Sequence, residues 1–128
     1  MKILVCGDRF WTNEKVIRDV LRNYLAADDV TIINGACRGA DKISTKVAKE
    51  LGFKVKEFPA DWKKFGRAAG PKRNERMAKQ FPEMVLSFHN NLNESKGTKN
   101  MIETAKKFNI PFLIISEIES ETGNGWVG

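Results

Sequence analysis

The chain has 128 residues, of which 41% are hydrophobic and 30% are charged, so its size and composition fit one globular domain. Apolar runs extend to roughly five residues, which excludes a membrane-spanning helix, and residues 1–6 are too few for a secretory signal. The net charge of +6 favours anionic partners, while two cysteines, Cys6 and Cys37, give no disulfide framework and fit a reducing, cytoplasmic setting.

Strand-like and helix-like patterns alternate along the chain. Short apolar or alternating segments predict five strands, at residues 2–6, 30–33, 53–58, 84–88 and 111–115. Apolar residues at helical spacing predict four helices, at residues 12–25, 39–51, 71–80 and 98–108. Residues 116–128 are polar and contain glycine, so we expect a partly mobile tail after a single domain of residues 1–115.

This alternation favours an α/β fold with a doubly wound, parallel five-stranded sheet and helices on both faces. Ligands of such folds bind beyond the carboxyl ends of the strands. Four polar or glycine-rich loops are predicted to meet at that edge, at residues 7–9, 35–41, 60–70 and 89–97. The sequence therefore predicts a nucleotide crevice formed by these loops.

Residues 66–77 carry the most specific pattern of the chain. Small residues precede a helix predicted to begin at Pro71, because a proline loses no hydrogen bond at the first helical position. Lys72, Arg73 and Arg76 follow within two turns. Helix N-termini attract anions and arginine matches the geometry of phosphate, so we expect this segment to bind a phosphorylated ligand.

Two further loops have both a ligand-binding and a structural interpretation. In the 35–41 loop, glycines permit close approach of a ligand and Arg38 adds charge, but a tight strand-to-helix turn explains the same pattern. Residues 95–98 resemble an anion site in composition, but Thr98 also fits a simple helix cap.

The polar residues of two other loops have the same double interpretation. Asp8 and Arg9 either contact the ligand or form a salt bridge within the loop. Trp62 either stacks on a base, with Asp61 accepting from a ribose hydroxyl, or packs the loop.

The sequence gives little support for a metal site or for a catalytic nucleophile. His89 is the only histidine, and no cluster of histidine, cysteine and carboxylate has metal-ligand spacing, so we expect neither a metal nor another cofactor. Cys37 lacks an evident base other than His89 and is therefore a poor candidate nucleophile.

Five segments together resemble one known family: residues 7–9, 34–41, 58–62, 66–77 and 96–98. They are similar to the YspA-related branch of the SLOG superfamily, which is named for the Smf/DprA and LOG proteins. The resemblance extends to about residue 115 and implies a Rossmann-like domain that binds nucleotides or nucleotide-derived ligands. It also implies a bacterial or phage origin and a homo-oligomer.

The enzymatic LOG branch hydrolyses the N-glycosidic bond of nucleoside monophosphates. Its Arg-Lys-x-x-Met segment is similar to residues 73–77, in which Asn74 replaces the lysine. Its Pro-Gly-Gly-x-Gly-Thr-x-x-Glu segment is similar to the region of residues 94–101, where Met101 stands at the glutamate position. Because methionine cannot act as an acid or base, the resemblance leaves catalysis open, with Arg73, Glu94 and Asp61 as candidate catalytic residues.

Three functions are compatible with these observations. The chain binds a nucleotide-derived ligand as a sensor or sequestering protein, hydrolyses a nucleotide, or binds single-stranded DNA in the manner of DprA. Strand binding is the least favoured, because the cations lie beside glycine turns rather than along an aromatic groove. The candidate ligand-binding residues are Gly7, Asp8, Arg9, Gly35, Ala36, Arg38, Gly39, Asp41, Asp61, Trp62, Gly66, Arg67, Gly70, Arg73, Asn74, Ser95, Lys96, Gly97 and Thr98.

Overall fold

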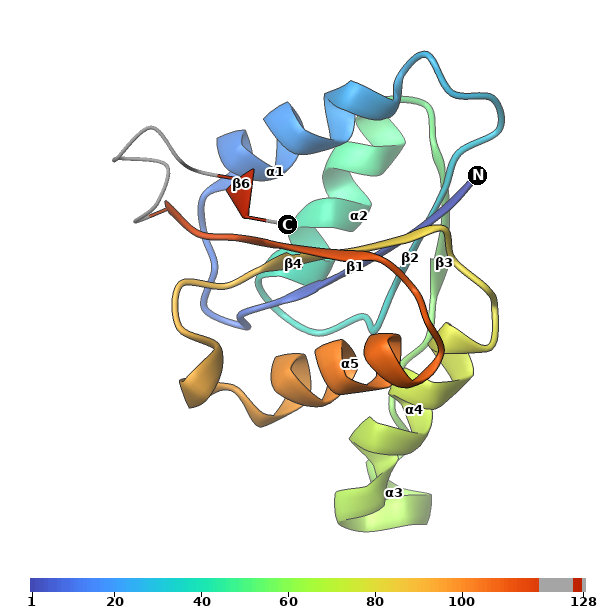
Figure 1. The fold of residues 1–128 in the computed structure, drawn as a ribbon, viewed down its shortest axis with the longest axis vertical. Coiled ribbons are helices and arrows are strands. Elements are labelled where there is room, and N and C mark those ends of the chain that lie inside the picture. The colour runs from blue at the N-terminus through green and yellow to red at the C-terminus, as the bar shows by residue number, and fades with distance from the viewer. Residues whose placement is uncertain (118–125, 128) are drawn as a thin grey trace.

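The computed structural model describes residues 1–117 and 126–127, which form a sheet between two layers of helices (Figure 1). The strands are β1 (Lys2–Gly7), β2 (Thr31–Asn34), β3 (Lys54–Glu57), β4 (Met84–Phe88), β5 (Phe112–Ile115) and β6 (Trp126–Val127). Their order is β3-β2-β1-β4-β5-β6, with β1 to β5 parallel and β6 antiparallel to β5.

The predicted parallel five-stranded sheet is confirmed. The short strand β6 is an addition that lies within the segment expected to be a mobile tail. The other residues of that tail beyond residue 117 lie outside the described part of the chain.

Two pairs of helices cover the two faces of the sheet, as the doubly wound prediction requires (Figure 1). Helices α1 (Glu14–Leu21) and α2 (Ala40–Glu50) lie on one face, and α4 (Ala69–Ala78) and α5 (Lys96–Lys107) lie on the other. None of the described helices has the length and apolar character needed to cross a bilayer.

The core is divided between the two faces by the alternation of side chains along β1. Ile3 and Val5 pack in the cluster that includes residues of α1 and α2, whereas Leu4 and Cys6 pack in the cluster that includes residues of α4 and α5. Burial on both faces explains why this strand has a continuous apolar sequence.

The structure departs from the predicted elements around α4. This helix begins at Ala69 rather than Pro71, and it ends at Ala78 rather than residue 80. The residues before it, predicted to be a loop, form the short helix α3 (Trp62–Phe65) and the 3-10 turn η2 (Gly66–Ala68). Pro71 is tolerated as the third residue of α4 because the N–H groups of a first helical turn have no acceptor within the helix, so the missing N–H of proline costs no intrahelical hydrogen bond.

Differences also occur at other helix ends. Helix α1 ends at Leu21 and gives way to the 3-10 turn η1 (Arg22–Tyr24), where the prediction continued one helix to residue 25. The 3-10 turn η3 (Leu92–Glu94) precedes α5, which begins at Lys96, two residues before the predicted start. Frayed and 3-10 ends of this kind leave only weak marks in a hydrophobic pattern.

Candidate functional site

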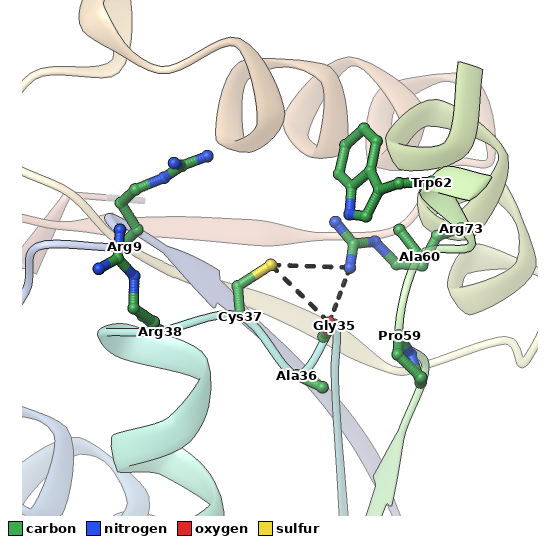
Figure 2. Close-up of a pocket in the computed structure, with 9 residues that line it drawn as sticks. All are labelled: Arg9, Gly35, Ala36, Cys37, Arg38, Pro59, Ala60, Trp62 and Arg73. Carbon is green, nitrogen blue, oxygen red and sulfur yellow. Dashed lines mark hydrogen bonds between the residues drawn. The ribbon is translucent and has the colours of Figure 1, made fainter. Parts of the chain in front are cut away.

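A hollow of about 380 Å³ opens beyond the carboxyl ends of β1, β2 and β3. Figure 2 shows Arg9 and Arg38 on one side of it, Arg73 and Trp62 on the other, and Cys37 between them. The full lining consists of Arg9, Gly35, Ala36, Cys37, Arg38, Pro59, Ala60, Trp62 and Arg73, and we call this space the arginine hollow. Its position at the carboxyl edge is the one expected for a ligand site in this class of fold.

Arg73 is the most firmly held side chain of the arginine hollow. It is only 8% exposed, and its Nη1 donates to the carbonyl of Gly35 at 2.8 Å and to that of Phe58 at 3.4 Å. Its Nε donates to Oδ1 of Asn74 at 2.9 Å. These bonds join the ends of β2 and β3 to α4 and fix the guanidinium before any ligand arrives.

The second terminal nitrogen of Arg73 remains available. Figure 2 shows it next to the Trp62 indole, and it has no hydrogen-bond partner among the described residues. The indole itself is 58% exposed. A fixed cation therefore lies beside a flat apolar ring at one end of the arginine hollow.

The 35–41 loop is held by its own side chains. Oδ2 of Asp41 accepts from the backbone N–H of Gly35 at 3.0 Å and from that of Cys37 at 3.2 Å. Oδ1 of Asn34 accepts from the N–H of Ala36 at 2.9 Å. Three N–H groups of this loop are thus already paired within it, as in a tight strand-to-helix turn, and Gly35, Ala36 and Arg38 of the same loop also line the arginine hollow.

Burial dominates the titration of Asp41. It raises the pKa of this carboxyl from 3.8 to about 6, against the opposing effects of the Cys37 N–H, the Arg73 charge and the Gly35 N–H, while Glu57 raises it slightly further. Above that pKa, Asp41 is ionised and lies behind the loop, where its negative charge attracts the Arg73 guanidinium.

The electrostatic character of the arginine hollow follows from its lining. It includes the three guanidinium groups of Arg9, Arg38 and Arg73 but no aspartate, glutamate or histidine. Arg38 also lies over the exposed ring of Phe10, with 5.9 Å between its Cζ and the ring centroid. Such a site can bind an anion, but its walls provide no carboxylate for acid or base catalysis.

Six of the predicted ligand-binding residues meet in the lining: Arg9, Gly35, Ala36, Arg38, Trp62 and Arg73. Gly7, Gly39 and Asp8 lie behind the lining residues and set the course of the backbone there. A side chain at Gly7 would collide with the carbonyl of Phe88, one at Gly39 would collide with the backbone of Arg9, and Asp8 accepts the N–H of Ala40 at its carbonyl, 3.1 Å away.

Several predicted residues have structural positions outside the lining. Ser95 caps α5, because its Oγ accepts from the N–H of Thr98 at 3.2 Å. Asp61 caps α3 in the same way, with its Oδ1 accepting from the N–H of Lys64 at 3.1 Å. Further predicted residues outside the lining are Gly66, Arg67, Gly70, Asn74, Glu94, Lys96 and Gly97.

The start of the third helix differs from the geometry on which its anion site was predicted. Because η2 runs directly into α4, the N–H of Ala69 already donates to the carbonyl of Gly66. Asn74 is buried between helices, where its Nδ2 donates to Oδ1 of Asn100 at 2.9 Å and to the carbonyl of Gly97 at 3.3 Å. This segment thus supplies Arg73 to the arginine hollow from the inner face of α4 rather than from its N-terminus.

Three lining residues were missed by the sequence analysis: Cys37, Pro59 and Ala60. Each lies two or three residues beyond the end of β2 or β3, so a position shortly after a predicted strand was the available signal. Cys37 is exposed, with its Sγ 3.8 Å from Nη1 of Arg73. His89 is buried and accepts the N–H of Asn91 at its Nδ1, and the described residues hold no cluster suited to a metal ion.

A model of one protein family matches the N-terminal half of the chain. This is the YspA, cpYpsA-related SLOG family, and the match covers residues 1–65, from β1 to the end of α3. The chain belongs to this SLOG family. Membership supports a nucleotide-related function in general terms. A comparison with curated proteins gave no match.

Solved structures that resemble this SLOG chain include the following two. DNA processing protein A (DprA) from Streptococcus pneumoniae matches with a TM-score of 0.71 and 16% identity, over 89% of this chain and 50% of that one. The chain thus spans about half the length of DprA, and the likeness at this identity shows the shared fold. The C-terminal domain of a Pyrococcus furiosus hydrogenase matches with a TM-score of 0.49 and 16% identity, over 88% of this chain and 89% of that one.

Proposed function

We propose that this SLOG chain binds a nucleotide or nucleotide-derived phosphate in the arginine hollow and acts as a sensor or a sequestering protein. The observation that carries the proposal is the lining, in which three guanidinium groups and one exposed indole surround a space without any acidic side chain. Guanidinium groups match phosphate oxygens, and an exposed indole offers a stacking surface for a base.

The two ends of the arginine hollow have different roles in this proposal. Arg73 and Trp62 hold the nucleotide end, because the fixed guanidinium and the indole stand side by side (Figure 2). Arg9 and Arg38 are exposed and hold a further phosphate at the other end. The prior fixation of Arg73 lowers the entropy that binding would otherwise cost.

No observation at the site favours the hydrolase alternative. The lining has no carboxylate, and Met101, which stands at the glutamate position of the LOG motif, is 1% exposed and packs in the core cluster on the α4 and α5 side. The candidate carboxylates Asp61 and Glu94 are likewise outside the lining. We therefore propose that the chain binds its ligand without hydrolysing it.

The test is thermal unfolding of the chain with AMP, ADP-ribose, NAD and cyclic dinucleotides. A ligand at about a hundred times its Kd adds roughly 2.7 kcal/mol of stability, which corresponds to a rise in Tm on the order of 10 °C. We expect such a rise for at least one of these compounds, with the compound recovered intact. Release of the base would instead favour the hydrolase, and no shift with any compound would contradict a nucleotide site.

Variants locate the binding site on the chain. Trp62→Ala and Arg9→Gln should each abolish most of the shift while leaving the Tm of the free protein unchanged, because both side chains are exposed. Arg22→Gln is the matched control, since Arg22 is also exposed but lies in η1, outside the arginine hollow. An equal loss of the shift in all three variants would place the ligand elsewhere.

A further inference from the structure

The positive charge of the chain is concentrated in one segment. Residues 61–79 hold seven of the 22 lysines and arginines but only two of the 16 aspartates and glutamates, so they carry +5 of the net charge of +6. These residues form α3, η2 and α4, and we call them the basic arm. Figure 1 shows α3 and the beginning of α4 projecting away from the sheet, beyond the rest of the fold.

Apart from the buried Arg73, the cations of the basic arm are exposed and mostly without an ion pair, in contrast to those on the opposite face of the sheet. Five of the seven ion pairs among the described residues involve a cation of α1 or α2. Within the basic arm the only such pair joins Lys79 to Glu75, at 3.2 Å. The exposed cations without an ion pair in the described structure are Lys63, Lys64, Arg67, Lys72 and Arg76.

A shallow groove gives this charge a definite location. It has a volume of about 290 Å³ and is lined by Phe65, Lys72, Glu75, Arg76 and Lys79. Lys72 and Arg76 of α4 and its C-cap residue Lys79 follow one another at intervals of four and three residues, so they lie along one face of the helix. The groove is therefore bordered by a row of cations rather than by one isolated charge.

Exposed aromatic rings accompany these cations. Phe65, at the edge of the groove, is 39% exposed, and Nζ of Lys72 lies 5.0 Å from its ring centroid. Trp62 stands three residues earlier and is also exposed. Rings beside cations that have no ion pair match the two parts of a nucleotide chain, its bases and its phosphates.

We infer that the basic arm binds single-stranded nucleic acid along the groove, outside the arginine hollow. Lys72 and Arg76 contact phosphates, and Phe65 stacks on an unpaired base. A duplex would use the cations but leave the ring without a partner, because its bases are already stacked and paired. An acidic protein surface would likewise match the charge but not the exposed ring.

The test is fluorescence anisotropy of a labelled thymidine oligomer of about 15 nucleotides, titrated with the intact chain at several salt concentrations between about 50 and 200 mM. We expect binding that weakens steeply with salt. Each phosphate contact on a single strand contributes about 0.7 to the slope of log K against log salt, so Lys72→Gln/Arg76→Gln should lower that slope by about 1.4. Phe65→Ala should weaken binding about fivefold or more without changing the slope.

The control is the double variant Arg22→Gln/Lys49→Gln. It removes the same charge from two exposed residues on the side of α1 and α2 that make no ion pair among the described residues, and it should leave both affinity and slope unchanged. The inference is overturned if the oligomer does not bind at low salt, if the control variant weakens binding as much as the groove variant, or if a duplex of equal length binds as well and Phe65→Ala has no effect.

Discussion

Gly35 and Arg73 depend on each other at the floor of the arginine hollow. The guanidinium lies against the Cα of Gly35 and donates to its carbonyl, so a Cβ at this position would overlap Nη1 and would stand 2.7 Å from Cζ of Arg73. The glycine is required here for space, not for backbone conformation. One missing side chain thus allows the site's most buried cation to reach the hollow.

Gly35→Ala should therefore destabilise the chain and weaken nucleotide binding together. Arg73 would have to move and lose its bond to the Gly35 carbonyl, at a cost of about 1–3 kcal/mol in the free energy of unfolding, measured by urea denaturation. Gly97→Ala is the control, because a Cβ there meets nothing within 4 Å and the residue is helical, so stability should change by less than about 1 kcal/mol. Equal stability of Gly35→Ala and the wild type would contradict this packing.

Asp41 should make stability depend on pH in a direction opposite to that of a paired surface carboxylate. Its pKa is about 6 in the folded chain against 3.8 unfolded, so the folded state keeps a proton that the unfolded state has lost. The free energy of unfolding should therefore fall by up to roughly 3 kcal/mol as pH rises from about 4 through 6, and then level off.

The measurement is urea unfolding of the wild type and of Asp41→Asn across this pH range. The amide oxygen can still accept from Gly35 and Cys37, so the variant keeps the turn but loses the titration. The stability of the wild type relative to the variant should decline with rising pH. A relative stability that rises instead would mean that Arg73 and the two N–H groups outweigh burial.

At the scale of elements, the strands and helices with a buried apolar face were predictable from the sequence, but the hydrogen-bond partners of the polar groups in the loops were not. Strands and helices buried by their apolar faces were predicted to within a few residues, and β4 was predicted in full. The helix α3 was missed because its four residues bury no side chain and so leave no hydrophobic period. The two interpretations of the 35–41 loop could not be separated, because the sequence alone does not show that Asp41 and Asn34 accept hydrogen bonds from its N–H groups.

In helix α5, a residue at a catalytic position of the LOG motif is part of the hydrophobic core. Met101 stands at the glutamate position of the LOG motif, yet it lies in the core cluster with Leu4 and Met77. A carboxylate there would be buried without a partner, which costs several kcal/mol. Met101 points into the core because of its position on α5, so a match to the motif does not by itself bring this side chain to the ligand site.

Met101→Glu should accordingly unfold or strongly destabilise the chain and should release no base from AMP. Met101→Leu is the control and should cost less than about 1.5 kcal/mol, since it conserves volume and polarity. Urea denaturation and chromatographic detection of adenine are the two measurements. A folded Met101→Glu protein that hydrolyses AMP would show that a catalytic carboxylate can be accommodated at this position.

At the scale of the whole molecule, the sheet ties the two halves of the chain together through its centre. β1 pairs with β2 on one side and with β4 on the other, where five residue pairs run from Ile3↔Met84 to Gly7↔Phe88. The family match ends at residue 65, before β4 begins. The arginine hollow likewise needs both halves, because Arg73 comes from α4 and Arg9 from the loop after β1.

The matched region of residues 1–65 should therefore not fold alone. Without β4, the side of β1 that pairs with Met84 to Phe88 becomes an open edge, and Trp11 loses the Phe88 ring, whose centroid lies 5.8 Å from its own. We expect a fragment of residues 1–65 to show no cooperative thermal transition by circular dichroism, whereas the full chain unfolds in one transition. A cooperative transition in the fragment would show that the N-terminal half is an autonomous unit, and the single cooperative domain argued from the sheet order would then be wrong.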